Sequence, residues 1–276
     1  MRDWVFLDVG NVLLDEDRLT WLVLSRYAAA VAKVCPEVTA LDVVARFERK
    51  LEVNVRWPLY EAVRDLLEDE VLTTVWNETA HEVRARYQEV CPLIPGAAAV
   101  VQNLSSRFEL GLIANQGPEC RDALARSGLL DAFKVVAFSE ELGVHKPDRR
   151  LFDAALHRAN ITAARAWMVG DRLDNDIEPA LDLGMRAVWI RWPNRAAKGW
   201  AGDNSAAKAY LSVIERRVEC ASSGLRATLR SSLTGNAFAV VDEIGDIETA
   251  LICATPDSFN FFLSGKRDLN SLREEW

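Results

Sequence analysis

Six short apolar segments recur along the chain, and they constrain its fold more than any other feature. Each has the length of a β-strand. Most lack the alternation of apolar and polar residues that a half-exposed strand shows, so we expect strands that are covered on both faces. The expected strands are residues 4–7, 110–113, 135–138, 166–169, 187–190 and 237–241.

Stretches with helical patterning separate these segments. They include residues 97–106, 121–127, 148–159 and 176–183. Strands that alternate with helices are typical of a parallel sheet with helices on both sides. The sequence therefore predicts an α/β fold with a doubly wound, Rossmann-like parallel sheet.

One block breaks this alternation directly after the first strand. From about residue 16 to residue 90 there is no convincing strand, and the pattern is helical at 19–34, 40–51, 59–67 and 72–90. A block of about 75 residues is far longer than a crossover connection needs, although an unusually long crossover is the alternative. We expect a helical cap domain at 15–92, inserted into a core formed by 1–14 and 93–252.

A second irregularity lies at residues 204–235. Its first part looks helical and its second part is rich in Ser and Gly. The segment carries five Lys or Arg against two Glu in an otherwise acidic chain. We expect a solvated surface insertion in the core, and the alternative is an element that binds a protein partner. The charged segment 253–276 is expected to be a peripheral tail.

Composition narrows the classes of function. The net charge of −8 argues against a dedicated nucleic-acid binder. No apolar stretch reaches the roughly 18 residues of a membrane span, so we expect no membrane association. The five cysteines are odd in number and show no CxxC spacing, which is typical of reduced thiols in a cytoplasmic protein. The oligomeric state stays open.

Polar residues follow several expected strands at the point where each strand ends. The carboxyl ends of parallel strands meet at one edge of a sheet, where ligands bind. A Lys clustered there with several Asp suits a phosphate and a divalent cation, since Mg²⁺ prefers oxygen ligands. The residues that follow strands are Asp8, Asn115, Asp171, Asp174 and Asp176, and Lys146 lies in the loop before the helix expected from Asp148.

The segments that carry these residues read FLDVGNVLLDED, GLIANQG, ELGVHKPD and MVGDRLDND. In this order they resemble the four motifs of the haloacid dehalogenase superfamily, and the helical block resembles its cap. The resemblance covers residues 1–252, and it is specific because the motifs occur together after the right strands. It implies a hydrolase with a Rossmann-like core.

The resemblance implies roles for the acidic residues. Asp8 resembles the nucleophile that accepts a phosphoryl group as an acyl phosphate. Its other oxygen, the backbone carbonyl of Gly10 and the carboxylate of Asp171 would bind Mg²⁺. Asp176 would be a further ligand or would orient the site. For Asp174 we favour a surface role.

Two further residues of the motifs would contact the phosphate. Lys146 resembles the catalytic cation that offsets charge between Asp8 and the phosphate, and the backbone N–H of Asn115 resembles a phosphate donor. In the cap, Arg56 and Trp57 are candidates for substrate specificity, because Arg can grip an anion and Trp can stack on a ring. A structural salt bridge and a buried core Trp are the alternatives.

Two positions depart from the usual pattern. Gly10 stands where many family phosphatases have a second Asp that acts as acid and base, and Ala114 stands where the second motif usually has Ser or Thr. The loss of a general acid or base typically costs about 10²–10⁴-fold in rate. The DxGNV form of the first motif nevertheless resembles a branch that includes sugar-phosphate phosphatases.

The resulting expectation is a Mg²⁺-dependent phosphatase that acts on a small phosphorylated metabolite. A dehalogenase is disfavoured, because that branch uses no metal and would not need the GDRLDND segment. The main alternative is an impaired, enzyme-like binding protein that keeps the site for a ligand and uses residues 204–235 for a partner. Gly10 and Ala114 keep this alternative open.

Overall fold

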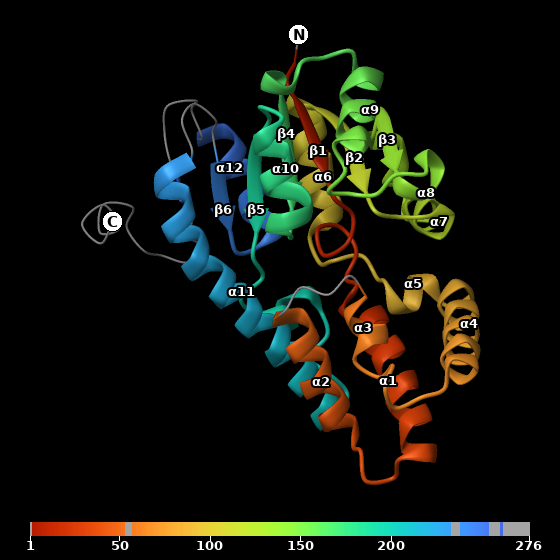
Figure 1. Ribbon diagram of the computed structural model, residues 1–276. Coiled ribbons are helices and arrows are strands. Elements are labelled where there is room, and N and C mark those ends of the chain that lie inside the picture. The colour runs from red at the N-terminus through yellow and green to blue at the C-terminus, as the bar shows by residue number, and fades with distance from the viewer. Residues whose placement is uncertain (1, 53–56, 233–237, 254–259, 262–276) are drawn as a thin grey trace. The chain divides into compact units, whose positions relative to one another are not determined.

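The computed structural model describes residues 2–52, 57–232, 238–253 and 260–261. It contains a parallel sheet of seven strands in the order β3-β2-β1-β4-β5-β6-β7 (Figure 1). The strands are β1 (Trp4–Leu7), β2 (Glu109–Ala114), β3 (Val135–Phe138), β4 (Ala166–Gly170), β5 (Arg186–Ile190), β6 (Phe238–Val241) and β7 (Asn260–Phe261). The predicted α/β fold with a doubly wound parallel sheet is confirmed.

Helices cover both faces of this sheet. One face packs against α9 (Arg149–Ala159) and α10 (Glu178–Asp182), and the other packs against α6 (Ala97–Arg107) and α12 (Ile247–Cys253). At the β3 end of the sheet lie α7 (Pro118–Arg126) and α8 (Ser139–Leu142). Coverage on both faces explains why the strands read as continuous apolar runs.

The central strand β1 shows how tightly the sheet is packed. Val5, Phe6 and Leu7 are fully buried. Phe6 pairs with Gly111 of β2, and a Cβ atom on Gly111 would lie 2.5 Å from the Phe6 ring. A glycine in the middle of a strand usually weakens it, but here it makes room for the aromatic side chain.

The contacts divide the described chain into two compact units. Residues 15–92 and 194–221 form one, and the remaining residues form the other, which contains the sheet. The helical unit comprises α1 (Asp17–Val34), α2 (Ala40–Glu52), α3 (Pro58–Glu61), α4 (Asp69–Ala85), α5 (Tyr87–Val90) and the first part of α11 (Ser205–Ser232). None of the helices in the described ranges has the length and apolar character needed to cross a membrane.

The predicted surface insertion at 204–235 requires a correction. The first part is helical, as expected, but the helix α11 continues as far as Ser232, and its residues up to 221 belong to the helical unit and not to the core. Tyr210 of α11 lies between the rings of Trp21 and Phe47, with both pairs of ring centroids 6.0 Å apart. Burial of its apolar face against α1 and α2 is the physical reason for the difference.

Other elements differ in detail from the expectation. The helical pattern at 72–90 forms two helices, α4 and α5, because the backbone leaves the helical conformation at Arg86 (φ −120°, ψ 21°). The pattern at 59–67 forms only the short α3. The tail predicted to be peripheral contributes Asn260–Phe261 to the sheet as β7, which pairs with β6.

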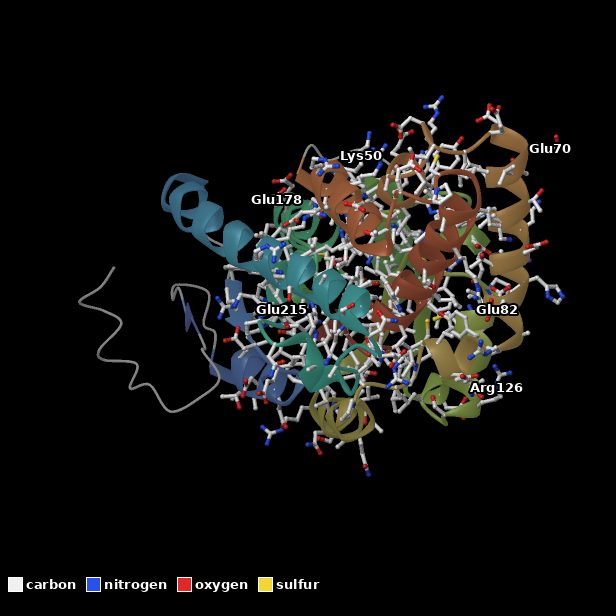
Figure 2. All side chains as sticks on the ribbon, turned by 90° about the horizontal axis from the view of Figure 1, so that it is seen from below. Lys50, Glu70, Glu82, Arg126, Glu178 and Glu215 are labelled. Atoms are coloured by element: carbon white, nitrogen blue, oxygen red, sulfur yellow. The ribbon has the colours of Figure 1, made fainter. Side chains whose placement is uncertain are left out.

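Within the helical unit, α4 packs against α1 and is otherwise largely exposed. Its buried residues are Leu72 and Thr79. Glu82 forms an ion pair with Arg26 of α1 at 2.9 Å. Glu70 and Glu82 both project from this helix (Figure 2). An exposed ion pair of this kind contributes little to stability.

A cluster of buried charges connects the two segments of the helical unit. The ammonium group of Lys198 lies 3.0 Å from Asp15 Oδ1 and 2.7 Å from Asp17 Oδ2, and all three side chains are at most 5% exposed. Arg195 approaches Asp17 at 3.6 Å. Buried carboxylates need such partners, because they have lost their hydration.

We predict that Lys198→Met lowers the free energy of unfolding by about 3–5 kcal/mol, because Asp15 and Asp17 lose the ammonium group that both contact. Urea unfolding followed by tryptophan fluorescence measures the change. Lys208→Met in α11 is the matched control, because Lys208 is exposed and surface changes usually stay within about 0.5 kcal/mol. Equal unfolding midpoints for the two variants would show that the cluster does not stabilise the fold.

Candidate active site

Two adjacent strands bring the first and fourth motifs together. Leu7 of β1 pairs with Val169 of β4, and the backbone N–H of Asp8 donates to the carbonyl of Val169 at 2.8 Å. Asp8 and Asp171 therefore follow neighbouring strands at their carboxyl ends. From this pair, successive strands are added on opposite sides, β2 and β3 next to β1 and β5 to β7 next to β4. The point at which the strand order reverses is a topological switch point, where open α/β sheets bind ligands.

Lys146 connects two of the predicted acidic residues. Its ammonium group lies 2.7 Å from Asp8 Oδ1 and 2.5 Å from Asp176 Oδ1. The side chain of Lys146 is 2% exposed and that of Asp176 is fully buried, whereas 13% of the Asp8 side chain remains exposed. Of the two carboxylates, Asp8 is the one that solvent or a substrate can reach.

Three carboxylates converge on one point at this edge. One oxygen each of Asp8, Asp171 and Asp176 lie within 4.8 Å of one another. Burial raises the pKa of the Asp8 carboxyl, and the nearby charge of Asp171 raises it further, against the opposing effect of Lys146. Burial and the charge of Asp8 raise the pKa of Asp176 to about 6, again against Lys146.

Burial and the neighbouring charges also shift the pKa of Lys146. Burial alone would lower the pKa of Lys146, but the carboxylates of Asp176 and Asp8 raise it to about 12. Lys146 is therefore a permanent cation at neutral pH, yet one ammonium group faces three carboxylates. The donor set is made of oxygens and carries excess negative charge, so the residues present fit a hard divalent cation such as Mg²⁺.

The close approach of Asp176 depends on a glycine at the end of β4. A Cβ atom on Gly170 would lie 2.3 Å from the Asp176 Cβ and 2.4 Å from its carboxyl carbon. Asp176 Oδ2 also accepts a hydrogen bond of 3.0 Å from the backbone N–H of Arg172. The segment from Leu173 to Ile177 is a turn of π-helix, an irregularity that is frequent at functional sites. In the sequence, the glycine directly before Asp171 was a signal for this close contact.

Asn115 has a role that sequence reasoning missed. Its side chain holds the backbone of Lys146 through two hydrogen bonds, from Asn115 Nδ2 to the Lys146 carbonyl at 3.1 Å and from the Lys146 N–H to Asn115 Oδ1 at 2.7 Å. This pair of bonds fixes the loop from which Lys146 reaches the carboxylates. The expected phosphate contact of the Asn115 backbone N–H stays a prediction.

The other predicted site residues occupy varied positions. Gly10 lies two residues beyond Asp8 and forms a β-bridge with Leu14. Asp174 lies at the surface and pairs with Arg172 at 2.6 Å. Trp57 is 62% exposed, which excludes the buried-core alternative for this residue. Arg56 lies outside the described residues.

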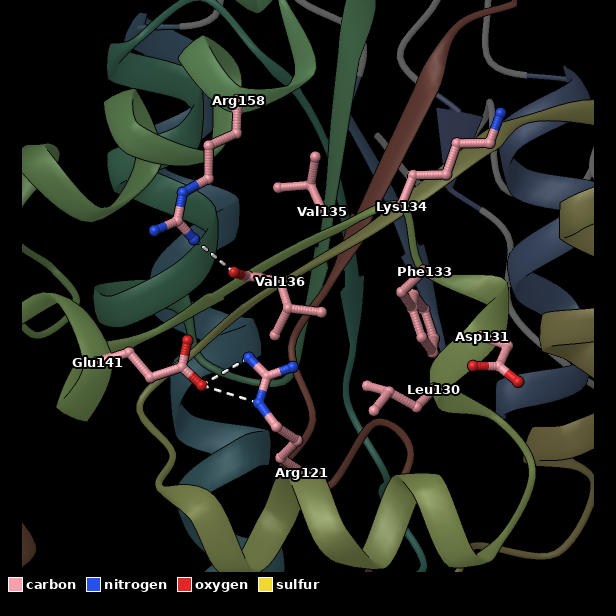
Figure 3. Close-up of a pocket in the computed structure, with 9 residues that line it drawn as sticks. All are labelled: Arg121, Leu130, Asp131, Phe133, Lys134, Val135, Val136, Glu141 and Arg158. Carbon is pink, nitrogen blue, oxygen red and sulfur yellow. Dashed lines mark hydrogen bonds and ion pairs between the residues drawn. The ribbon is translucent and has the colours of Figure 1, made fainter.

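A separate pocket of about 660 Å³ lies beside the edge strand β3. None of the candidate active-site residues lines it. Its cations already have partners. Arg121 binds Glu141, and Arg158 donates to the Val136 carbonyl at 2.6 Å (Figure 3). Lys134 pairs with Glu109. This pocket is therefore distinct from the candidate active site, and its cationic side chains take part in contacts within the protein.

Comparison with known proteins places the motifs in a family. The sequence profile of haloacid dehalogenase-like hydrolases matches residues 3–184. Pyrimidine 5′-nucleotidase YjjG of Escherichia coli is 34% identical over 109 residues, which are 39% of this chain and 48% of that protein. Phosphoserine phosphatase of Thermus thermophilus is 38% identical over 109 residues, or 39% of this chain and 42% of that protein. The chain thus spans less than half the length of these curated relatives.

Solved structures show the same fold. A HAD phosphatase from Thermococcus onnurineus superposes with a TM-score of 0.51 at 23% identity, covering 74% of this chain and 90% of that chain. The HAD-hydrolase YfnB from Bacillus subtilis, solved with bound magnesium, gives a TM-score of 0.52 at 20% identity, covering 70% and 90%. Because the family profile matches more than half of its length, the chain belongs to the haloacid dehalogenase-like hydrolases.

Proposed function

We propose that this protein is a Mg²⁺-dependent phosphohydrolase that acts on a small phosphorylated metabolite through an aspartyl-phosphate intermediate. The observation that carries the proposal is the buried Lys146 ammonium group between Asp8 and Asp176, with Asp171 completing a group of three carboxylates. The homologues with matching sequence include phosphatases of small phosphorylated metabolites, which supports this substrate class.

The geometry suits a division of roles among the residues. The partly exposed carboxylate of Asp8 attacks the phosphorus atom, and the P–O bond to the substrate's alcohol breaks, so that the alcohol leaves and takes up a proton from water. Water then hydrolyses the acyl phosphate, which releases inorganic phosphate and restores the Asp8 carboxylate. Asp8, Asp171 and the Gly10 carbonyl would hold Mg²⁺, with Asp176 as a further ligand or as the residue that orients the site, and the ion when bound would offset the charge of the phosphate oxygens. Lys146 holds Asp8 in place and adds a second positive charge beside the transferred group.

The helical unit is the proposed cap. Caps exclude water and complete an active site when they close. Trp57, which is 62% exposed, is available to stack on a substrate in this unit, and Arg56 beside it stays a proposed specificity residue. Neither Arg56 nor Trp57 identifies a particular metabolite. Screening a panel of phosphorylated compounds for phosphate release would identify the substrate.

A second candidate function is ligand or partner binding without efficient turnover. The specific observation in its favour is the pair of substitutions at Gly10 and Ala114, which removes an acid/base and a phosphate-binding hydroxyl. The positive bias of 204–235 is a weaker argument for partner binding than the sequence suggested, because the first part of that segment packs inside the helical unit.

We predict that Asp8→Asn abolishes phosphate release while the fold is retained, because the amide is nearly isosteric but a poor nucleophile. Phosphate release from the metabolite panel, with Mg²⁺ and with EDTA, measures the loss. Asp174→Asn is the matched control in the same group of acidic residues, because the Asp174 side chain is 56% exposed and pairs with the half-exposed Arg172. Turnover that survives Asp8→Asn, or that EDTA does not stop, would contradict the proposed mechanism.

We predict that Gly10→Asp raises steady-state turnover of a substrate with a good leaving group. The leaving group of such a substrate departs without needing a proton donor. In the native protein the hydrolysis of the acyl phosphate lacks a general base, so this second step limits the rate. Phosphorylated Asp8 then accumulates, and rapid-mixing kinetics show a burst followed by slow release. Gly10 does not have the positive φ found at Gly96 or Gly143, so its φ does not by itself require a glycine.

Two outcomes would overturn this second prediction. Fast native turnover without a burst would mean that another group acts as the base. Asp15 and Asp17 are poor choices for that role, because both form buried ion pairs with Lys198. Alternatively, a folded Gly10→Asp protein with unchanged slow turnover would locate the defect at Ala114.

A further inference from the structure

Two buried tryptophans on one segment donate hydrogen bonds to the two loops that carry the proposed metal ligands. The indole N–H of Trp189, on β5, donates to the backbone carbonyl of Asp171 at 3.0 Å. The indole N–H of Trp192, two residues beyond β5, donates to the backbone carbonyl of Asn11 at 2.6 Å. Each side chain is 2% exposed. Neither tryptophan lies in the four motifs.

Hydrogen bonds hold the backbone on both sides of Asn11, the residue that follows Gly10. The Asn11 N–H donates to the Leu14 carbonyl at 2.7 Å. Because C=O and N–H point in opposite directions across a trans peptide bond, this bond sets the direction of the Gly10 carbonyl. With the Asn11 carbonyl held by Trp192, hydrogen bonds fix the peptide groups on both sides of the Asn11 Cα.

The backbone at both ends of this hydrogen bond is strained. Asn11 has a φ of 54° and Trp192 has a φ of 50°. Asn adopts this left-handed conformation with moderate ease, but for a bulky residue such as Trp it is a genuine outlier. Strained residues persist where the surrounding structure holds them, and they cluster at functional sites. Here the strain places the indole N–H against the loop of the first motif.

The segment that carries both indoles is itself anchored to the sheet. Trp189 pairs with Gly170 at the end of β4. Between the two tryptophans, the Arg191 N–H donates to the Val241 carbonyl at 2.9 Å, and its guanidinium group binds Asp242 beyond β6 at 2.6 Å. A rigid element of this kind can hold loop groups within the narrow limits that a metal site requires.

We propose that Trp189 and Trp192 are positioning residues whose indole N–H groups orient the Asp171 and Gly10–Asn11 loops and thereby set the Mg²⁺ affinity of the site. The inference rests on the proposed function for the identity of the metal. It assigns no contact between either indole and the substrate. The indoles act on the ligands through the backbone, as outer-shell partners do in other metal sites.

The test is the Mg²⁺ dissociation constant of the Trp192→Phe protein, measured by isothermal titration calorimetry on the full chain without substrate. Phenylalanine keeps a buried aromatic ring and removes the N–H donor. We expect Mg²⁺ binding to weaken about 10-fold, the lower end of the range for loss of an outer-shell partner. Phosphate release by this variant should recover as the Mg²⁺ concentration rises, which a general loss of folding would not allow.

The matched control is Trp200→Phe. The indole N–H of Trp200 donates to Asp203 Oδ1 at 2.8 Å within the helical unit, so this variant loses one indole hydrogen bond without touching either loop. Its Mg²⁺ affinity should equal that of the native protein. Equal, native-like affinity in Trp192→Phe and Trp200→Phe would overturn the inference and leave the proposed function intact.

A native protein that binds no Mg²⁺ would overturn the proposed function together with this inference. If Trp192→Phe does not fold, an NMR titration of the native protein with Mg²⁺, with its indole N–H resonances assigned, tests the inference instead. Saturation with Mg²⁺ should shift the resonances of Trp189 and Trp192 and leave that of Trp200 in place. Unchanged resonances of Trp189 and Trp192 under saturating Mg²⁺ would contradict the inference.

Discussion

The Lys146 ammonium group, enclosed between the carboxylates of Asp8 and Asp176, is the interaction on which the site depends. Removal of such a cation from water carries a large penalty, and its burial is tolerated because two opposite charges lie at hydrogen-bond distance. Asp171 adds a third carboxylate to the group. The remaining excess of negative charge makes this edge of the sheet suitable for a divalent cation and, with it, a phosphate.

The parallel sheet brings these groups together from distant parts of the chain. Asp8 follows the central strand β1 and Asp171 follows its neighbour β4, so both lie at one switch point. Two small features refine the geometry. Gly170 leaves space for Asp176 against the end of β4, and the Asn115 side chain holds the Lys146 backbone. The charges are therefore positioned by rigid elements and not by flexible loops alone.

The sequence was sufficient to predict the α/β core and the convergence of Asp8, Lys146, Asp171 and Asp176. Both follow from local rules: unbroken apolar runs indicate strands covered on both faces, and the carboxyl ends of parallel strands meet at one edge. The acidic and basic residues at those ends needed no knowledge of distant packing. The side-chain role of Asn115 did, because its partner lies 31 residues further along the chain.

The location of α11 was beyond sequence reasoning for a similar reason. Its amphipathic pattern was visible, but the surface that covers Tyr210 is formed by Trp21 and Phe47, far earlier in the chain. No local signal connects them, and the Ser- and Gly-rich second part suggested a loop. Trp189 and Trp192 likewise resemble ordinary core residues until the acceptors of their indole N–H groups are known.

The central claim is that the carboxylates around Lys146 form a divalent-cation site. A crystal structure of the protein grown with Mn²⁺, with data collected at the manganese absorption edge, tests it most directly. We expect an anomalous peak at bonding distance from carboxylate oxygens of Asp8 and Asp171 and from the Gly10 carbonyl oxygen. Lys146 should still be paired with Asp176. Crystals that contain Mn²⁺ and show no peak between Asp8 and Asp171 would contradict it.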